Sequence, residues 1–204
     1  MALKSNINTI KKPYPIGIIG GGQLALMLLE AAKARGLKVC IQTKSEDDPA
    51  SLKADSVVFA DPIQLKGNKI LLKDCEKIIF ENEWINIDKL KQLETDNFFI
   101  PKLDALAPLV DRISQKQFLN NLNLPSPKWT TVKKFKNLDE ESIINLSFPL
   151  MAKSFKGGYD GKGNKKISNL EELNNFIDQS NSEDWILEEW INYTNDMVIL
   201  VGVI

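Results

Sequence analysis

The stretch Lys153-Ser-Phe-Lys-Gly-Gly-Tyr-Asp-Gly-Lys-Gly-Asn164 decides how the rest of the chain is interpreted. It lies between two segments with the apolar pattern of strands, residues 148–152 and 165–167. Glycines let backbone N–H groups converge on an anion, and the lysines supply positive charge. The stretch therefore predicts a flap that closes over the phosphates of a nucleotide. A hairpin with solvated lysines is the alternative, and the Gly-Lys-Ser/Thr ending of a Walker loop is absent.

Two neighbouring features fit a nucleotide site. Lys153 ends an apolar strand, where a lone ammonium would be poorly solvated, so pairing with a phosphate is expected. Glu188-Glu-Trp-Ile191 overlaps the end of another apolar strand and predicts backbone groups and a carboxylate for adenine and ribose. A solvated strand end is the alternative for these two glutamates.

A second glycine-rich turn, Gly20-Gly-Gly-Gln23, lies between an apolar strand at 16–19 and a helix that ends near Gly36. Such a turn offers backbone amides and a positive helix end to an anion, but it is equally a tight turn without a ligand. A dinucleotide fold would also place an acidic residue at the end of the second strand. Gln42-Thr-Lys44 stands there instead, which argues against a nicotinamide cofactor.

Further apolar strands are expected at 38–42, 56–59 and 77–80, and helical stretches fall between some of them, which predicts βαβ units on a parallel sheet. The predicted fold is α/β: a polar tail (1–14), a Rossmann-like parallel sheet (15–108) and an α+β domain (109–204). Within this arrangement we expect a linker over Pro101–Pro108, a helix capped by Asp111, and further elements at 129–132, 139–145, 168–179 and 185–189. The final stretch, 197–204, is apolar on both faces, so we expect a strand that needs a cover from outside the chain.

Composition excludes several classes of function. The 204 residues carry a net charge of −1, which gives no electrostatic case for nucleic acid or membrane. No apolar stretch is long enough to span a bilayer, and residues 1–12 lack a signal-peptide pattern, so a cytoplasmic location is expected. The absence of histidine excludes Ser–His and Cys–His nucleophile pairs and histidine-bound zinc. Cys40 and Cys75 are predicted to be buried structural thiols.

Four motifs together resemble one family. They are Ile18-Ile-Gly-Gly-Gly-Gln-Leu24, Asp111-Arg-Ile-Ser-Gln-Lys-Gln117, Gly157-Gly-Tyr-Asp-Gly-Lys-Gly163 and Leu187-Glu-Glu189. The combination is similar to the N5-carboxyaminoimidazole ribonucleotide synthases of purine biosynthesis, the ATPase subunit of phosphoribosylaminoimidazole carboxylase, in the ATP-grasp superfamily. The resemblance runs from about Ile16 to the last residue. It implies a pre-ATP-grasp domain followed by a truncated ATP-grasp domain.

The resemblance also implies site residues. Contacts to ATP would come from Arg112, Lys153, Gly158, Tyr159, Asp160, Gly161, Lys162, Gly163, Asn164, Glu188, Glu189, Trp190, Ile191 and Asp196. Contacts to aminoimidazole ribonucleotide would come from Gly21, Gly22, Gln23, Leu24, Glu81 and Glu83. The family's magnesium ligands and main catalytic residues are expected beyond Ile204, so no metal ligand is assigned. A homodimer is expected for the full-length family.

The family reaction is ATP-dependent carboxylation of the ribonucleotide with bicarbonate through carboxyphosphate. Because family members continue well past residue 204, we expect this polypeptide alone to be weak or inactive. Departures from the family pattern at Leu26, Asn82, Trp84 and Asn164 affect substrate contacts more than the fold. The alternatives are an ATP-binding remnant without turnover, or a related ligase such as formate-dependent glycinamide ribonucleotide transformylase or biotin carboxylase.

Overall fold

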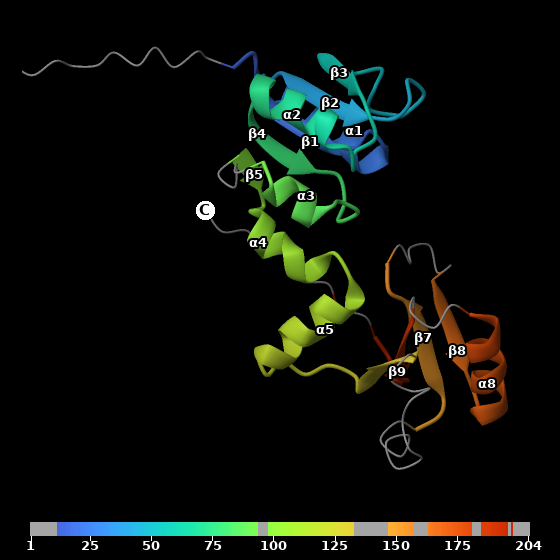
Figure 1. Ribbon diagram of the computed structural model, residues 1–204. Coiled ribbons are helices and arrows are strands. Elements are labelled where there is room, and N and C mark those ends of the chain that lie inside the picture. The colour runs from blue at the N-terminus through green and yellow to red at the C-terminus, as the bar shows by residue number, and fades with distance from the viewer. Residues whose placement is uncertain are drawn as a thin grey trace, which may run out of the picture. The chain divides into compact units, whose positions relative to one another are not determined.

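The structure is a computed structural model that describes residues 12–93, 98–132, 147–156, 163–180, 185–195 and 197. The chain divides into two compact units, Met1–Val110 and Asp111–Ile204. Figure 1 shows the helices and strands of each unit, and each is described by itself below.

The N-terminal unit is built on a five-stranded parallel sheet with the order β3-β2-β1-β4-β5. Its strands are β1 (Tyr14–Ile19), β2 (Val39–Thr43), β3 (Ser56–Phe59), β4 (Cys75–Phe80) and β5 (Phe99–Ile100). Its helices are α1 (Gln23–Lys33), α2 (Leu65–Asp74), α3 (Ile87–Lys91) and α4 (Leu103–Leu106), followed by a 3-10 turn, Ala107–Leu109. The predicted Rossmann-like parallel sheet is therefore confirmed.

Both faces of this sheet are buried, as a parallel sheet requires. Ile18 packs with Leu29 of α1 in one core, whereas its neighbour Ile19 packs with Leu71 of α2 in the other. Adjacent residues of a strand point to opposite faces, so one strand serves both cores. The continuous apolar run of β1 follows from this double coverage.

Two expectations for this unit have clear outcomes. The linker predicted over Pro101–Pro108 is wrong, because Leu103 and Leu106 are buried, only 1% and 9% exposed, on the inner face of α4. Apolar residues at i and i+3 give this short helix a face to bury, and the flanking prolines do not interrupt it. The thiols of Cys40 and Cys75 are free and buried, as predicted.

The C-terminal unit contains an antiparallel sheet with the order β6-β9-β7-β8. The strands are β6 (Trp129–Thr131), β7 (Leu150–Ser154), β8 (Asn164–Ile167) and β9 (Trp185–Glu189), and the helices are α5 (Arg112–Asn121) and α8 (Leu170–Gln179). Leu173 and Phe176 of α8 join Ala152 and Leu187 of the sheet in one core. The apolar covering by α8 leaves the opposite face of the sheet for polar groups.

Side chains cap both of the helices described in this unit. Asp111 accepts a hydrogen bond from the N–H of Ser114 at 2.7 Å, which confirms the predicted start of α5. At α8, Asn169 accepts from the N–H of Glu172 at 2.9 Å. The helix predicted at 139–145 and the strand predicted at 197–204 lie outside the described residues, except for Met197. Among the helices of the described ranges, none has the length and apolar character needed to cross a membrane.

Candidate functional site

The C-terminal unit has a cavity on the sheet face that α8 leaves uncovered. In the strand register Met151 lies opposite Glu188, and Lys153 lies opposite Asn164. Because side chains alternate along a strand, these four residues share that face. A cavity of about 400 Å³ opens there. It is lined by Pro127, Met151, Lys153, Asn164, Glu188, Glu189, Trp190, Ile191 and Tyr193.

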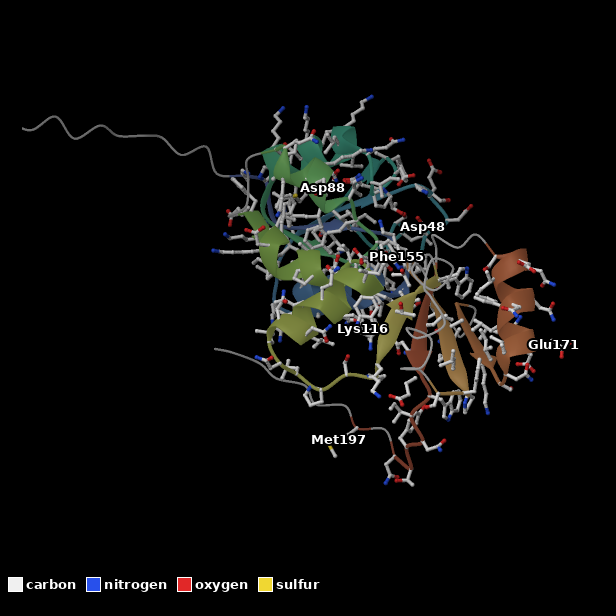
Figure 2. All side chains as sticks on the ribbon, turned by 60° about the horizontal axis from the view of Figure 1, so that its bottom comes forward. Asp48, Asp88, Lys116, Phe155, Glu171 and Met197 are labelled. Carbon is white, nitrogen blue, oxygen red and sulfur yellow. The ribbon has the colours of Figure 1, made fainter. Side chains whose placement is uncertain are left out.

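A buried carboxylate that pairs with two lysines lies at one wall of the cavity, and only one of these lysines lines the cavity. Glu188 is 3% exposed. Its Oε2 lies 2.7 Å from Nζ of Lys153, which lines the cavity, and its Oε1 lies 3.2 Å from Nζ of Lys116, which does not. Lys116 lies on α5 (Figure 2). The ammonium of Lys153 thus has a carboxylate partner within the protein, where a phosphate alone was expected. Two cations on one anion leave the cluster with a surplus positive charge, which favours an anionic ligand.

The start of α5 is tied to the end of β7, where the glycine-rich stretch begins. The guanidinium Nε of Arg112 donates to the carbonyl of Ser154 at 2.9 Å, and its backbone N–H donates to the carbonyl of Phe155 at 3.2 Å. The N–H of Ser154 donates to the carbonyl of Gly163 at 2.8 Å. Arg112, Gly163 and Asn164 therefore lie near one strand end, and their contacts with ATP stay a prediction. The expected ATP ligands Gly158, Tyr159, Asp160, Gly161, Lys162 and Asp196 lie outside the described residues.

The segment after β9 supplies the apolar side of the cavity. The indole N–H of Trp190 donates to Oδ1 of Asn192 at 2.8 Å, and the ammonium of Lys166 lies 4.6 Å from the centre of the indole ring. Glu189 is fixed by its backbone N–H, which donates to the carbonyl of Lys128 at 2.9 Å. With Trp190, Met151 and Tyr193 offer surfaces on which a planar base can stack.

The N-terminal unit has a cavity of its own, of about 370 Å³, at the carboxyl ends of β1, β2 and β4. The strand order changes direction between β1 and β4, and ligands of open α/β sheets bind at such a point. Its lining residues are Ile19, Gly20, Gly21, Thr43, Lys44, Asp48, Asp61, Pro62, Ile63, Asn82, Trp84 and Ile85.

The carboxylate of Glu81 occupies the amino end of α1. It accepts hydrogen bonds from the N–H of Gly22 at 3.0 Å and from that of Ala25 at 3.4 Å. Gly20 has a φ of +126°, and a Cβ there would lie 2.3 Å from Oε2 of Glu81. A Cβ on Gly22 would lie 2.4 Å from Oε1. The glycine turn is thus shaped to admit a carboxylate of the protein itself, which uses the Gly22 amide, one of those expected to serve a substrate.

The remaining residues predicted to bind the substrate differ in whether they line this cavity. Gly21 lines the cavity, whereas Gln23, Leu24 and Glu83 are exposed and do not line it. Sequence reasoning missed Lys44 and the other polar groups of the rim. Their signal was their position directly after β2 and β3, at the same sheet edge as the glycine turn.

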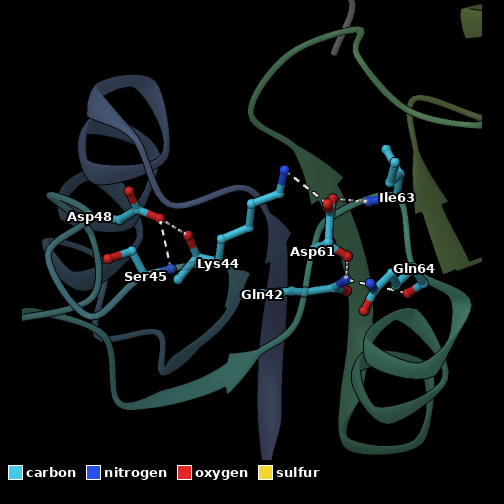
Figure 3. A network of polar contacts seen from close by, with 8 residues as sticks. Gln42, Lys44, Ser45, Asp48, Asp61, Ile63 and Gln64 are labelled. Carbon is cyan, nitrogen blue, oxygen red and sulfur yellow. Dashed lines mark hydrogen bonds and ion pairs between the residues drawn. The ribbon is translucent and has the colours of Figure 1, made fainter.

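A polar network fixes this rim (Figure 3). The ammonium of Lys44 lies 2.8 Å from Oδ2 of Asp61, and the N–H of Ile63 donates to Oδ1 at 3.1 Å. Partial burial acts to raise the pKa of Asp61, but Lys44 and the N–H of Ile63 outweigh it and lower that pKa below its ordinary value. The carboxylate is therefore held ionised beside the cavity.

Behind the rim, the amide of Gln42 is fully buried. Its Nε2 donates to the carbonyl of Asp61 at 2.8 Å, and its Oε1 accepts from Nδ2 of Asn68 at 2.9 Å. On the other side, Thr43 donates its hydroxyl to the carboxylate of Asp48. The residue that a dinucleotide fold would require to be acidic thus has a structural role, in agreement with the sequence argument against a nicotinamide cofactor.

Sequence reasoning did not single out Lys116 or Tyr193 of the C-terminal site. Lys116 stands four residues after Arg112, so the two share a helix face, and this spacing was a usable signal. Across the described ranges, no group of three or more Cys, Asp or Glu side chains is placed to hold a metal ion. The described residues therefore do not fit a protein-held magnesium site.

Comparisons with known proteins agree with this architecture. A family model described as the ribonucleotide synthetase preATP-grasp domain matches residues 14–109, and the ATP-grasp domain model matches residues 117–202. The chain thus matches a pre-ATP-grasp domain followed by an ATP-grasp domain. It is homologous to the N5-carboxyaminoimidazole ribonucleotide synthases, as the motifs predicted.

The relatives include the synthase of Synechococcus elongatus, 35% identical over 188 residues, which are 92% of this chain and 47% of the relative. The synthase of Staphylococcus aureus MRSA252 is 32% identical over 197 residues, or 96% of this chain and 52% of the relative. A crystal structure of the Staphylococcus aureus synthetase with ADP matches with a TM-score of 0.78 at 31% identity, over 92% of this chain and 49% of that one. The chain spans about half the length of the curated relatives it matches.

Proposed function

We propose that the C-terminal unit binds the adenine nucleotide and the N-terminal unit binds aminoimidazole ribonucleotide, for ATP-dependent carboxylation in purine biosynthesis. The observation that carries the proposal is the cavity beside Lys153 and Glu188. It joins a surplus positive charge to an apolar wall, in a fold that matches a synthetase crystallised with ADP. Phosphates suit the first part and a base suits the second.

Each predicted ATP residue has a role in this proposal. Lys153 pairs with a phosphate, and Arg112 holds the end of β7 from which the glycine-rich residues 158–164 extend. Glu188, Glu189, Trp190 and Ile191 border the base and ribose, and Asp196 follows them in the chain. Gly21 lines the proposed ribonucleotide cavity, and Glu81 holds the adjoining glycine turn through the N–H of Gly22. Contacts of the ribonucleotide with Gln23, Leu24 and Glu83 stay part of the proposal.

The reaction itself is proposed for the family's whole enzyme, because the chain spans about half the length of its relatives. Bicarbonate would attack the γ-phosphate of ATP to give carboxyphosphate and ADP. The amine of the ribonucleotide would then take the carboxyl group, and phosphate would leave. The contribution of this chain is positive charge from Lys153, which offsets repulsion between bicarbonate and the polyphosphate. Magnesium would enter bound to ATP.

Calorimetry tests the binding steps on the chain. ATP and aminoimidazole ribonucleotide should each bind with one-to-one stoichiometry, and neither should displace the other. The reaction is tested by ADP release that requires both the ribonucleotide and bicarbonate. Absence of ATP binding at millimolar concentration, or ADP release that is independent of the ribonucleotide, would contradict the proposal. The expected cytoplasmic location and homodimer stay predictions.

A further inference from the structure

Lys116 is a buried lysine that no expected ATP contact includes. It lies in the middle of α5, is only 7% exposed, and does not line the 400 Å³ cavity. Its Nζ contacts one oxygen of Glu188, while Lys153 contacts the other. A buried lysine is stable only beside an opposite charge. Lys116 pairs with Glu188, a carboxylate that is also paired with Lys153.

The two lysines differ in access to the cavity. The side chain of Lys153 is 28% exposed and lines the cavity, whereas the side chain of Lys116 is 9% exposed and lies behind Glu188. Only Lys153 can therefore turn from Glu188 toward a ligand. If it does, Glu188 stays buried, and Lys116 is the cation that remains beside it.

We infer that Lys116 is a positioning residue, the resident counter-ion of Glu188, and that it leaves Lys153 available for nucleotide phosphate. With Lys116 present, Glu188 remains neutralised when Lys153 moves to the phosphate. Without Lys116, that movement would leave a buried carboxylate unpaired, so Lys153 would stay with Glu188. The inference rests on the proposed nucleotide site and adds a residue that acts through Glu188.

The test is a set of variants with binding measured by calorimetry. Lys116→Met should weaken ATP binding at least ten-fold and change adenosine binding less than two-fold, because adenosine has no phosphate for Lys153. Lys116→Arg keeps the charge and should bind ATP within about three-fold of wild type. Gln117→Met, an exposed neighbour on α5, is the control for introducing methionine and should bind ATP as wild type does.

The double variant Lys116→Met/Glu188→Gln separates positioning from folding. It removes the carboxylate that would retain Lys153, so it should bind ATP within about three-fold of Glu188→Gln alone, which controls for any contact that Glu188 itself makes with the nucleotide. Circular dichroism shows whether each variant is folded. If Lys116→Met is not folded, the Lys116→Arg variant and the comparison of the double variant with Glu188→Gln decide. ATP affinity of Lys116→Met equal to wild type, or a folded double variant ten-fold weaker than Glu188→Gln alone, would overturn the inference. Failure of the wild-type chain to bind ATP would instead remove the proposed function, and the inference with it.

Discussion

Replacing Glu81 with alanine should destabilise the N-terminal unit, because Glu81 caps the amino end of α1. The variant loses the hydrogen bonds from Gly22 and Ala25, at 3.0 and 3.4 Å. Loss of a capping acceptor costs about 1 kcal/mol. Loss of a negative charge at the positive helix end adds about 0.3–1 kcal/mol. Together these losses should lower the free energy of unfolding of this unit by about 1.3–2 kcal/mol. Glu81→Gln keeps an acceptor and should lose about half of that.

Glu83→Ala is the matched control, because Glu83 is exposed two residues away and should change stability by less than about 0.5 kcal/mol. Native-state hydrogen exchange of the β1 and β2 amides gives the opening free energy of this unit without interference from the other. If Glu81→Ala and Glu83→Ala have equal opening free energies, Glu81 is not the cap that we describe.

Three further predictions concern stability and reactivity. Asn169→Ala should cost α8 about 1 kcal/mol in urea denaturation, whereas exposed Asn174→Ala should not lower stability; equal values would argue against the cap. Because the pKa of Asp61 is lowered in the folded chain, its stabilising effect is present above the unfolded pKa of about 3.9 and is lost as pH falls through the lower folded value. Stability curves of Asp61→Asn should accordingly fall less steeply below about pH 4, and an unchanged slope would contradict this. The hydrogen bond with Cys40 and burial raise the pKa of the Cys75 thiol, so iodoacetamide at pH 8 should modify Cys75 only after denaturation, which peptide mass spectrometry can check.

The parallel sheet was predictable because β1 and β2 are largely apolar runs and the helical pattern of α1 lies between them in the chain. Helix α4 in the region 101–108 was not predictable from the sequence. The prolines there indicate a loop, and only Leu103 and Leu106 have the spacing of a buried helix face. The two-residue strand β5 has too short a pattern to be detected. Its Phe99 is nevertheless 2% exposed and stacks on Phe80 at 5.6 Å.

The sequence indicated which segments form the candidate sites, but not which side chains contact one another within them. Lys153 and Glu188 were both singled out, yet their pairing depends on the register of β7 against β9, which two separate segments of sequence do not reveal. Glu81 was expected to face a substrate, while the structure shows it bound to the amino end of α1. In both cases a carboxylate contacts a group that is distant in sequence: Glu188 contacts Lys153 of β7, and Glu81 contacts the amino end of α1.

The most direct test of the nucleotide site is equilibrium binding of ATP to the wild-type chain and to two lysine variants. Lys153→Met removes a charged hydrogen bond to phosphate, worth about 1.5–3 kcal/mol, so ATP should bind about ten- to hundred-fold more weakly. Lys165→Met is the control, because Lys165 of β8 lies on the α8 face of the sheet, away from the cavity. It pairs with Ala152 of the α8 core, and its ammonium lies over the ring of Phe176. This variant should bind ATP as wild type does. Equal affinity of the wild type and Lys153→Met for ATP would contradict the account.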